Sequence, residues 1–324
     1  MSLSVGIVGL PNVGKSTLFN ALLKKQVAQI GEYPYTTIEP NVGVVEVLDE
    51  RLTKLADVIA GDPSASLRPS ALRSSTLRFG LEELRLEETN RPQVVPAAIR
   101  FIDIAGLIKG AHRGEGLGNQ FLAYIREVNA ILHVVRAFEN PSVTHVHEKI
   151  DLLTDVEVVN TELELGGIKK PIIYVLNVAE ADLLKDFQLS FPYIKISAKL
   201  EAELFDLSEA EQKEYFNSLS VKQSGLDQII LASYELLDLV TFFTIVGGKQ
   251  AQAWPVKVGT KMIEAAGMVH SDFEKGFIAA ETIIWQKLIE AGSWHRAKDL
   301  GLVKTVGRDE IVQDGIVIEF KFSL

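Results

Sequence analysis

The sequence predicts a doubly wound, mostly parallel α/β sheet of the P-loop NTPase (G-domain-like) class, then a helical connection and a smaller C-terminal β domain. The first observation is the pattern Gly-x-x-x-x-Gly-Lys-Ser over residues 9–16. The second is that residues 5–8 before it form a short apolar run, as in a buried parallel strand, and residues 18–25 after it have helical spacing. The third is a series of further short apolar runs that end in polar residues. Strand, glycine loop and helix therefore follow in the order that phosphate binding requires.

The glycine-rich loop predicts how a nucleoside triphosphate would be held. Glycines such as Gly14 let backbone N–H groups curl around phosphate oxygens, and the helix N-terminus adds its positive end. Lys15 is expected to reach the β- and γ-phosphates, and the Ser16 hydroxyl to bind Mg²⁺. A chance glycine-rich turn is the alternative, and the flanking strand and helix argue against it.

Composition sets broad limits without adding a function. The 324 residues suggest about two domains, and the absence of cysteine excludes disulfides and thiolate metal sites, as in a reducing cytoplasm. No apolar stretch approaches the roughly 18 residues that a membrane helix needs, so no membrane partner is expected. The net charge of −10 argues against indiscriminate polyanion binding. Residues 241–324 hold ten basic and ten acidic residues, so that part could still present a local basic face to RNA.

Two loops carry the signals of nucleotide-sensing switches. Residues 31–41 contain two prolines and lead into a β-branched strand over 42–47. A threonine in such a loop can donate its hydroxyl to the Mg²⁺ that bridges the terminal phosphates. An ordinary proline-bounded loop is the alternative. The strand 98–103 ends in Asp103, which is expected to hold the Mg²⁺ shell, and Gly106 follows with a backbone N–H for the γ-phosphate.

The residues after Gly106 bear on the rate of hydrolysis. Four glycines within residues 107–121 predict a flexible second switch. Small GTPases place a glutamine directly after this glycine to orient the attacking water, but Leu107 stands here. Either turnover is slow or another group positions the water, and His112 is the nearest candidate in the sequence. A solvent-exposed loop histidine is the alternative.

Two further strand ends carry the signals for base recognition. The strand 130–136 is buried, the strand 171–177 runs into Asn177-Val178-Ala179-Glu180, and the strand 193–196 leads into Ser197-Ala198-Lys199. GTPases usually carry Asn-Lys-x-Asp at the first site, where the aspartate accepts from both N1–H and the amino group of guanine. A site built to pair with guanine discriminates strongly, and losing the aspartate removes that discrimination. Adenine is therefore favoured, with guanine left open.

These motifs together resemble the YchF/Obg-like ATPase family, a branch of the translation-factor-related P-loop GTPases. The resemblance rests on residues 9–17, 33–43, 103–121, 177–180, 197–199 and most of 223–324. It implies ATP binding and slow hydrolysis, with Ser16 and Thr37 on Mg²⁺. It also implies a set of nucleotide contacts, which are Asn12, Val13, Gly14, Lys15, Ser16 and Thr17 at the phosphates, and Asn177, the Val178 backbone, Glu180, Ser197 and Ala198 at the base. Taken together, the motifs and the resemblance give Lys15, Thr37, Gly106 and His112 as the candidate catalytic residues. In several relatives the asparagine equivalent to Asn12 helps hold K⁺, which makes K⁺ a candidate cofactor here.

The C-terminal part resembles the TGS domain of that family, a small β-grasp module. The match is carried by residues 253–260, 265–278 and 311–322. Residues 316–322 partly alternate, as in a half-buried strand, and Asp314-Gly315 before them predicts a turn. His270 and Asp272 are interpreted as a capped helix start rather than a metal site. The resemblance implies RNA and the ribosome as partners.

The predicted organisation is a nucleotide-binding domain over 1–205, a helical connection over 206–240 and the TGS-like domain over 241–324. Two departures from the family pattern stand out. The helical arm that relatives insert is cut short near 156–170, and a stretch of about 61–90 is added. That stretch is either a basic loop that touches a partner or a solvated surface loop.

The leading hypothesis is a cytoplasmic ATPase that hydrolyses slowly, switches shape and signals to the translation machinery. One alternative is a GTPase of the Obg type. A second alternative is a nucleotide-gated binding module in which ribosome contact is the function and hydrolysis is incidental. The sequence leaves the oligomeric state open.

Overall fold

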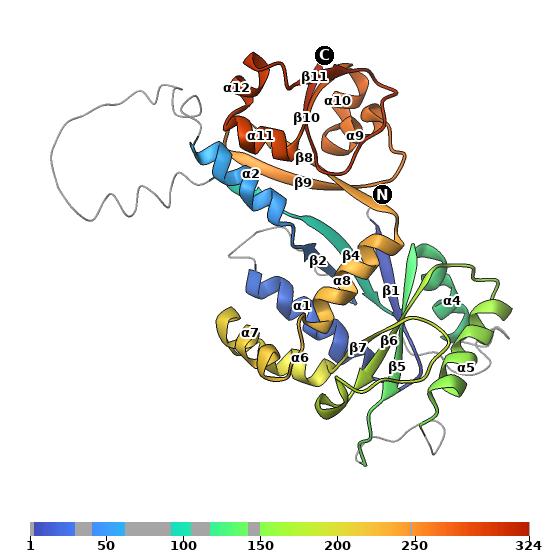
Figure 1. Cartoon of the computed structure of the whole chain (residues 1–324). Helices are drawn as coiled ribbons and strands as arrows, with labels where there is room; N and C mark the ends of the chain where they lie inside the picture. The colour runs from blue at the N-terminus through green and yellow to red at the C-terminus, as the bar shows by residue number, and fades with distance from the viewer. Residues whose placement is uncertain are drawn as a thin grey trace, which may run out of the picture. The chain divides into compact units, whose positions relative to one another are not determined.

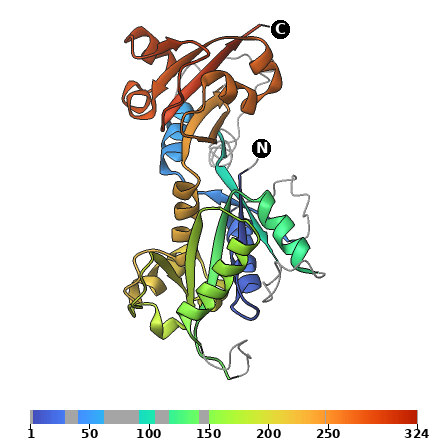
Figure 2. The same cartoon turned by 90° about the vertical axis from the view of Figure 1, so that its right-hand side faces the viewer.

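The computed structural model describes residues 3–29, 41–61, 92–104, 117–141, 150–246 and 248–323. The chain divides into two compact units, each made of two separate stretches. The first unit comprises Met1–Glu46 and Ala98–Leu237, and the second comprises Val47–Ala97 and Asp238–Leu324. Figure 1 shows the elements of each unit by colour along the chain, and Figure 2 shows them turned by 90°.

The first unit is built on a six-stranded sheet of order β2-β4-β1-β5-β6-β7. Parallel pairing runs without interruption from β4 through β1, β5 and β6 to β7. All five residues of β1 are buried, which explains its continuous apolar sequence. The strands are β1 (Ser4–Val8), β2 (Val42–Val47), β4 (Ala97–Asp103), β5 (Ala130–Ala137), β6 (Ile172–Val178) and β7 (Tyr193–Ile196).

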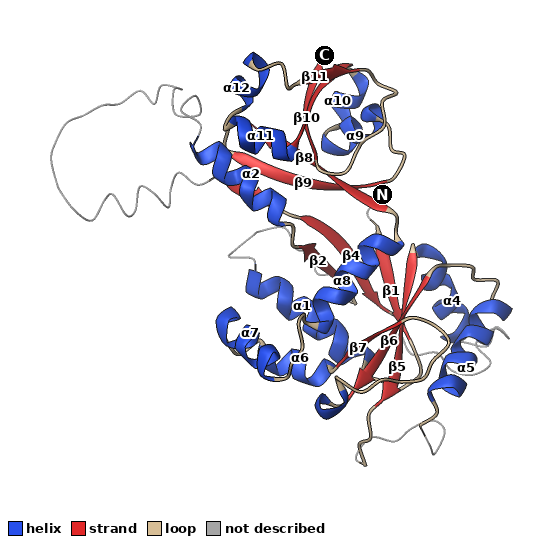
Figure 3. Cartoon of the chain, in the orientation of Figure 1, coloured by secondary structure: helices blue, strands red, loops and turns tan. Residues whose placement is uncertain are grey.

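Helices cover both faces of this sheet, as the doubly wound prediction requires (Figures 1 and 3). Two of them, α4 (Leu117–Glu127) and α5 (Leu152–Leu165), lie on one face. The other face carries α1 (Lys15–Gln29), α6 (Ala198–Leu204), α7 (Glu209–Ser218) and α8 (Gly225–Leu236). Several of these helices begin with a polar N-cap residue. The Asp151 side chain accepts hydrogen bonds from backbone amides in the first turn of α5, and Ser208 forms a capping box with Glu211 in α7. The predicted α/β P-loop fold is confirmed.

The second unit has a mixed sheet of order β11-β10-β12-β8-β9-β3. β12 pairs in parallel with β8, and β3 pairs in parallel with β9, whereas the other neighbours are antiparallel. The strands are β3 (Gln93–Val95), β8 (Leu239–Val246), β9 (Gln250–Lys257), β10 (Phe277–Ile284), β11 (Lys304–Val306) and β12 (Ile316–Phe322).

Successive phenylalanines of β8 show how helices cover both faces of this second sheet. Phe242 packs in a core cluster with Met262 of α9 (Met262–Val269), whereas the Phe243 ring lies 5.3 Å from the guanidinium of Arg51 in α2 (Glu50–Gly61). Three shorter helices complete the unit: α10 (Ser271–Lys275), α11 (Trp285–Ala291) and α12 (Trp294–Asp299). His270 caps α10 by accepting from the Asp272 amide at 3.2 Å, so the predicted capped helix start is found here.

The division into units differs from the sequence-based boundaries at two places. Residues 47–97 were assigned to the nucleotide-binding domain, but they belong to the second unit because β3 pairs with β9 from Gln93↔Gln250 onward. Helix α8 was assigned to a connection, but it belongs to the first unit, where its Gly225 amide donates to the Glu201 carboxylate of α6 at 2.6 Å. Both differences arise from pairings between residues far apart in the sequence.

The region of the predicted shortened arm lies in the first unit. Helix α5 ends at Leu165, Gly166 forms its C-cap, and β6 already begins at Ile172. The connection between these two elements is therefore short. Of the added stretch at 61–90, only its first residue lies within the described part of the chain, at the end of α2.

Within the described residues, none of the helices combines the length and the apolar character needed to cross a lipid bilayer.

Candidate functional site

The glycine-rich loop has a backbone that its glycines make attainable. Gly9 has φ 153° and Gly14 has φ 98°, both in the region that favours glycine, and Asn12 between them has φ 63°. A Cβ on Gly9 would overlap the Val134 carbonyl oxygen, and one on Gly14 would overlap the Asn177 side chain. The loop is therefore pressed against the sheet, and its glycines cannot be replaced without moving the backbone.

Lys15, the first residue of α1, is folded back onto this loop. Its side chain is buried, and Nζ donates to the carbonyl oxygens of Gly9 at 3.1 Å and Leu10 at 2.8 Å. Burial lowers the pKa of Lys15 to about 8, and the nearby carboxylate of Asp103 opposes this shift. A phosphate at this point would supply the negative charge that favours the protonated lysine.

Ser16 and Asp103 are brought together although 87 residues separate them in the sequence. Ser16 follows Lys15 in α1, Asp103 ends β4, and the Ser16 hydroxyl donates to Oδ2 of Asp103 at 3.0 Å. The pairing of β1 with β4 at Ile7↔Asp103 explains why the two meet beside the loop. Hydroxyl and carboxylate oxygens are the ligands that Mg²⁺ prefers, so these two residues fit the predicted metal role.

Asn177 joins the glycine-rich loop to the Ser197-Ala198 loop. Its side chain is buried, its Nδ2 donates to the Val13 carbonyl at 2.9 Å, and its Oδ1 accepts from the Ala198 amide at 3.1 Å. The sequence assigned Asn177 to the base, and the structure adds a positioning role that the sequence did not suggest. The carboxyl ends of β1, β6 and β7 are fixed to one another through this one amide.

Val178 and Ser197 use their side chains for structure. The Val178 side chain packs in an apolar cluster with Val135 and Leu176, so this side chain is not available to a base. Ser197 caps α6, with Oγ accepting from the Leu200 amide at 3.5 Å. The Ala198 amide already donates to Asn177.

Glu180 begins the short 3₁₀ helix Glu180–Asp182 and is exposed. Its Oε1 accepts from the hydroxyl of Tyr215 in α7 at 2.8 Å, and this hydrogen bond raises the pKa of Tyr215. Tyr215 was not among the predicted site residues, because no motif marks it and 35 residues separate it from Glu180.

His133 is a second residue that the sequence analysis did not single out. It lies in β5 opposite Val8 of β1, is 1% exposed, and its Nδ1 has no hydrogen-bond partner among the described residues. Burial, and secondarily the charge of Lys15, lower the pKa of His133 to about 3. The imidazole is therefore neutral at physiological pH. The only signal in the sequence for a buried, neutral histidine is its position within an apolar strand.

Several predicted residues lie outside the described part of the chain, namely Thr37, Gly106, Leu107 and His112. Asn12 and Thr17 are described and are exposed on the loop and the first turn of α1. Nowhere in the described ranges do three or more His, Asp or Glu residues gather as a metal site. A Mg²⁺ at Ser16 and Asp103 would therefore draw its remaining ligands from phosphate oxygens, water or residues beyond those ranges.

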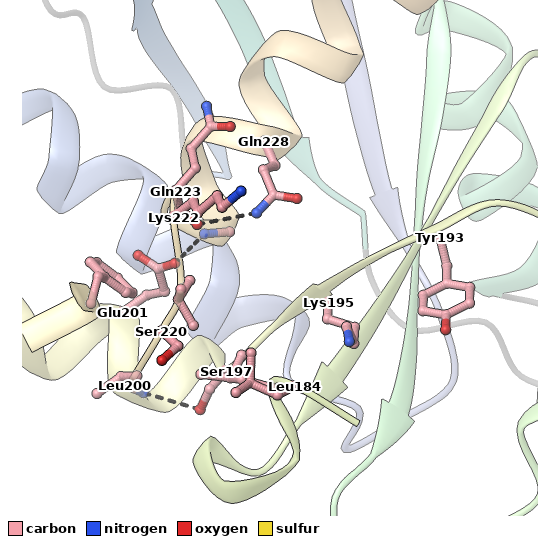
Figure 4. A pocket seen from close by; sticks show the side chains of 14 residues that line it. Leu184, Tyr193, Lys195, Ser197, Leu200, Glu201, Ser220, Lys222, Gln223 and Gln228 are labelled. Carbon is pink, nitrogen blue, oxygen red and sulfur yellow. Dashed lines mark hydrogen bonds between the residues drawn. The ribbon is translucent and has the colours of Figure 1, made fainter. Parts of the chain in front are cut away.

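A cavity of about 400 Å³ lies beside the Ser197 loop (Figure 4). Leu184, Lys195 and Gln228 are among its lining, and Glu201 lies at its edge with its carboxylate bonded to the start of α8. Burial raises the pKa of Glu201, while the Gly225 amide that it accepts from acts in the opposite direction. Among the described residues that line the cavity, Ser197 is the one that the sequence assigned to the base.

The geometry of this site can now be compared with known proteins. Residues 4–178 match a family described as 50S ribosome-binding GTPase, and residues 239–323 match the YchF GTPase C-terminal family, described as a protein of unknown function. The Ribosome-binding ATPase YchF of Bacillus subtilis (strain 168) is 36% identical over 398 residues, covering 100% of both chains. That of Haemophilus influenzae is 35% identical over 395 residues with the same coverage. This chain belongs to the YchF family.

Solved structures support this assignment. The Schizosaccharomyces pombe YchF GTPase matches with a TM-score of 0.75 and 27% identity, covering 99% of this chain and 98% of that one. A GTP-binding protein from Pyrococcus horikoshii OT3 shares the fold, with a TM-score of 0.56 and 17% identity over 99% of this chain and 100% of that one. The resemblance inferred from the sequence motifs is thus confirmed.

The alignments of this chain with its YchF relatives contain more positions than the chain has residues. The match to the Bacillus subtilis protein spans 398 positions, 74 more than the 324 residues present here. The relatives therefore carry segments without a counterpart in this chain.

Proposed function

We propose that this YchF-family chain is a nucleotide-dependent switch that binds ATP with Mg²⁺, hydrolyses it slowly and acts on the ribosome. The single observation that carries the proposal is the contrast within one site. The phosphate end has its full set of groups in Lys15, Ser16 and Asp103, whereas Glu180 stands at the base end in place of the guanine-binding aspartate. The relatives named Ribosome-binding ATPase YchF support ATP as ligand and the ribosome as partner.

At the phosphate end, the chain's own residues account for binding. Phosphate oxygens would replace the Gly9 and Leu10 carbonyls as partners of Lys15, and their charge would keep the lysine protonated. Ser16 and Asp103 would hold Mg²⁺, with Thr37 as a third candidate, and the metal would neutralise charge on the terminal phosphates. Asn12 is the candidate ligand if K⁺ takes part.

At the base end, the same logic favours adenine. Guanine offers two adjacent donors that an aspartate accepts together, and adenine offers an amino donor beside a ring acceptor. Glu180 is already bonded to Tyr215 through one oxygen, which suits a base with a single donor at this edge. Asn177 and the Val178 backbone would complete the contacts to adenine.

Slow turnover follows from the residue after the switch glycine. Leu107 cannot orient water, and His112 is the candidate for that task. The second unit, with its mixed sheet and its TGS-like sequence, is the candidate for contact with ribosomal RNA. Its balanced charge over 241–324 contrasts with the acidic remainder of the chain.

Nucleotide competition tests the proposal most directly. Displacement of a fluorescent ATP analogue by ATP and by GTP should give tighter binding for ATP, and micromolar GTP binding without ATP binding would defeat the proposal. Ribosome co-sedimentation should differ among the ATP, ADP and non-hydrolysable-analogue states. Equal ribosome binding in all three states would leave ATP binding in place and remove the switch.

A further inference from the structure

We infer that Tyr215 is a positioning residue that sets the preference for adenine over guanine, acting through Glu180. The inference builds on the proposed function, because it assumes that residues 177–180 face the base. Tyr215 lies in α7, outside every nucleotide-binding motif of the chain.

The geometry places Tyr215 at the correct point for this role. Glu180 follows Asn177 by three residues, and Asn177 is fixed by its bonds to Val13 and Ala198, so the start of the 3₁₀ helix has little freedom. From the other side, the Tyr215 hydroxyl donates to Oε1 of Glu180 at 2.8 Å. One carboxylate oxygen of Glu180 is thereby held by a second element, α7.

Helix α7 is a firm support for the tyrosine. Its first turn is closed by the capping box between Ser208 and Glu211, with both reciprocal hydrogen bonds formed. Its last turn is closed by the Leu219 amide, which donates to the Tyr215 carbonyl at 3.1 Å. The phenol therefore projects from an ordered helix, and its position restricts the rotamers that Glu180 can adopt.

The chemistry of the two bases converts this restraint into selectivity. Guanine needs a carboxylate turned so that both oxygens accept, one from N1–H and one from the amino group. Turning Glu180 in that way would break its bond to Tyr215 and exchange this charge-assisted hydrogen bond for hydrogen bonds to water, because both side chains are exposed. Adenine has only its amino group to donate, so the free oxygen of Glu180 can accept from it while Tyr215 keeps the other.

Removing the phenol hydroxyl should therefore relax the preference without unfolding the chain. In Tyr215→Phe the ring remains, Glu180 is released to rotate, and guanine can recruit both oxygens. We expect the ratio of GTP to ATP dissociation constants to fall by about threefold, because water can replace the lost hydrogen bond at these exposed side chains. The change should come mainly from tighter GTP binding.

The experiment measures the dissociation constants of ATP and GTP for the full chain by calorimetry in the presence of Mg²⁺. Tyr124→Phe is the matched control, because Tyr124 is an exposed tyrosine in α4 on the other face of the sheet. Glu180→Ala is a second variant, which removes the acceptor of the Tyr215 hydrogen bond and leaves the phenol in place. In the double variant, Tyr215→Phe should add no further change in the ratio.

The outcomes separate this inference from the proposed function. Wild-type preference for ATP together with an unchanged ratio in Tyr215→Phe would overturn the role of Tyr215 and leave the proposed function standing. Additive effects of Tyr215→Phe and Glu180→Ala would also overturn it, because the tyrosine would then act elsewhere. Preference of the wild-type chain for GTP would defeat the proposed function itself, and the inference with it.

Discussion

The phosphate end and the base end of the site are held together in different ways. At the phosphate end, the buried Lys15 and the glycine-rich loop are fixed by backbone carbonyls and by close packing against β5. At the base end, Glu180 and Tyr215 form one hydrogen bond between exposed side chains. Backbone-determined geometry resists change by substitution, whereas a single side-chain contact does not. We therefore expect the geometry of the phosphate end to tolerate few substitutions, and the preference for one base to change with a single substitution.

The largest effect should come from the phosphate end. Lys15→Met keeps the length of the side chain but removes the charge that would face the phosphates, so we expect ATP affinity to fall by about a hundredfold or more. Calorimetric titration with ATP and Mg²⁺ measures this loss, and Lys185→Met, at an exposed lysine, is the control. Wild-type affinity in Lys15→Met would mean that the buried lysine is structural only.

The next effect should come from the residue that connects the two ends. Asn177→Ala leaves the Val13 carbonyl and the Ala198 amide without partners. We expect the free energy of unfolding to drop by about 2–3 kcal/mol. The affinities for ATP and GTP should fall by the same factor, since the phosphate end and the base end of the site lose their alignment. Urea unfolding and nucleotide titration measure the two effects, with the exposed Asn217→Ala as control. Loss of one nucleotide only would show that Asn177 serves the base alone.

A pH dependence should mark the phosphate end. The pKa of Lys15 is lowered to about 8, so above that pH the free chain holds this lysine neutral and a bound triphosphate must restore its proton. ATP affinity should therefore decline by about tenfold per pH unit above pH 8, with uptake of close to one proton on binding at pH 9. Calorimetry in two buffers of different ionisation enthalpy measures the uptake. Absence of proton uptake in the wild type, or equal uptake in Lys15→Met, would contradict this assignment.

The smallest effect should come from the helix cap at the base end. Ser197 accepts from the Leu200 amide at a long 3.5 Å, so Ser197→Ala should cost about 0.5–1 kcal/mol of stability and weaken ATP by less than about threefold. Thermal unfolding and ATP titration measure this, and Ser224→Ala, at the cap of α8, is the matched control. A loss of ATP affinity as large as in Asn177→Ala would mean that the Ser197 hydroxyl contacts the base directly.

The sequence predicted the phosphate end well because its signals are local. Strand, loop and helix are contiguous, and the geometry of Lys15 and Ser16 follows from that order. Asp103 was also found, because it ends an apolar run at the edge where parallel strands finish. The structure gives the positions of Lys15, Ser16 and Asp103, and the roles of these residues remain predictions, as do those of Thr37, Gly106 and His112.

Two of the features that escaped prediction depend on contacts between residues far apart in the sequence. Gln93 joins Gln250 across 157 residues to place β3 in the second sheet, and no local pattern announces such a partner. Tyr215 reaches Glu180 in the same way, from a helix that was interpreted only as part of a connection. His133 was hidden inside a strand whose apolar neighbours gave the stronger signal.

The place of β12 in the second sheet has a consequence for the order in which the chain is made. This strand, Ile316–Phe322, lies between β10 and β8 although it is the last strand along the chain. During synthesis, α2 and β3 leave the ribosome early but have no finished sheet to join until those final residues emerge. The first unit, whose last helix ends at Leu236, can close well before that. Loss of residues 315–324 would therefore remove an interior strand of the second sheet and separate β10 from β8.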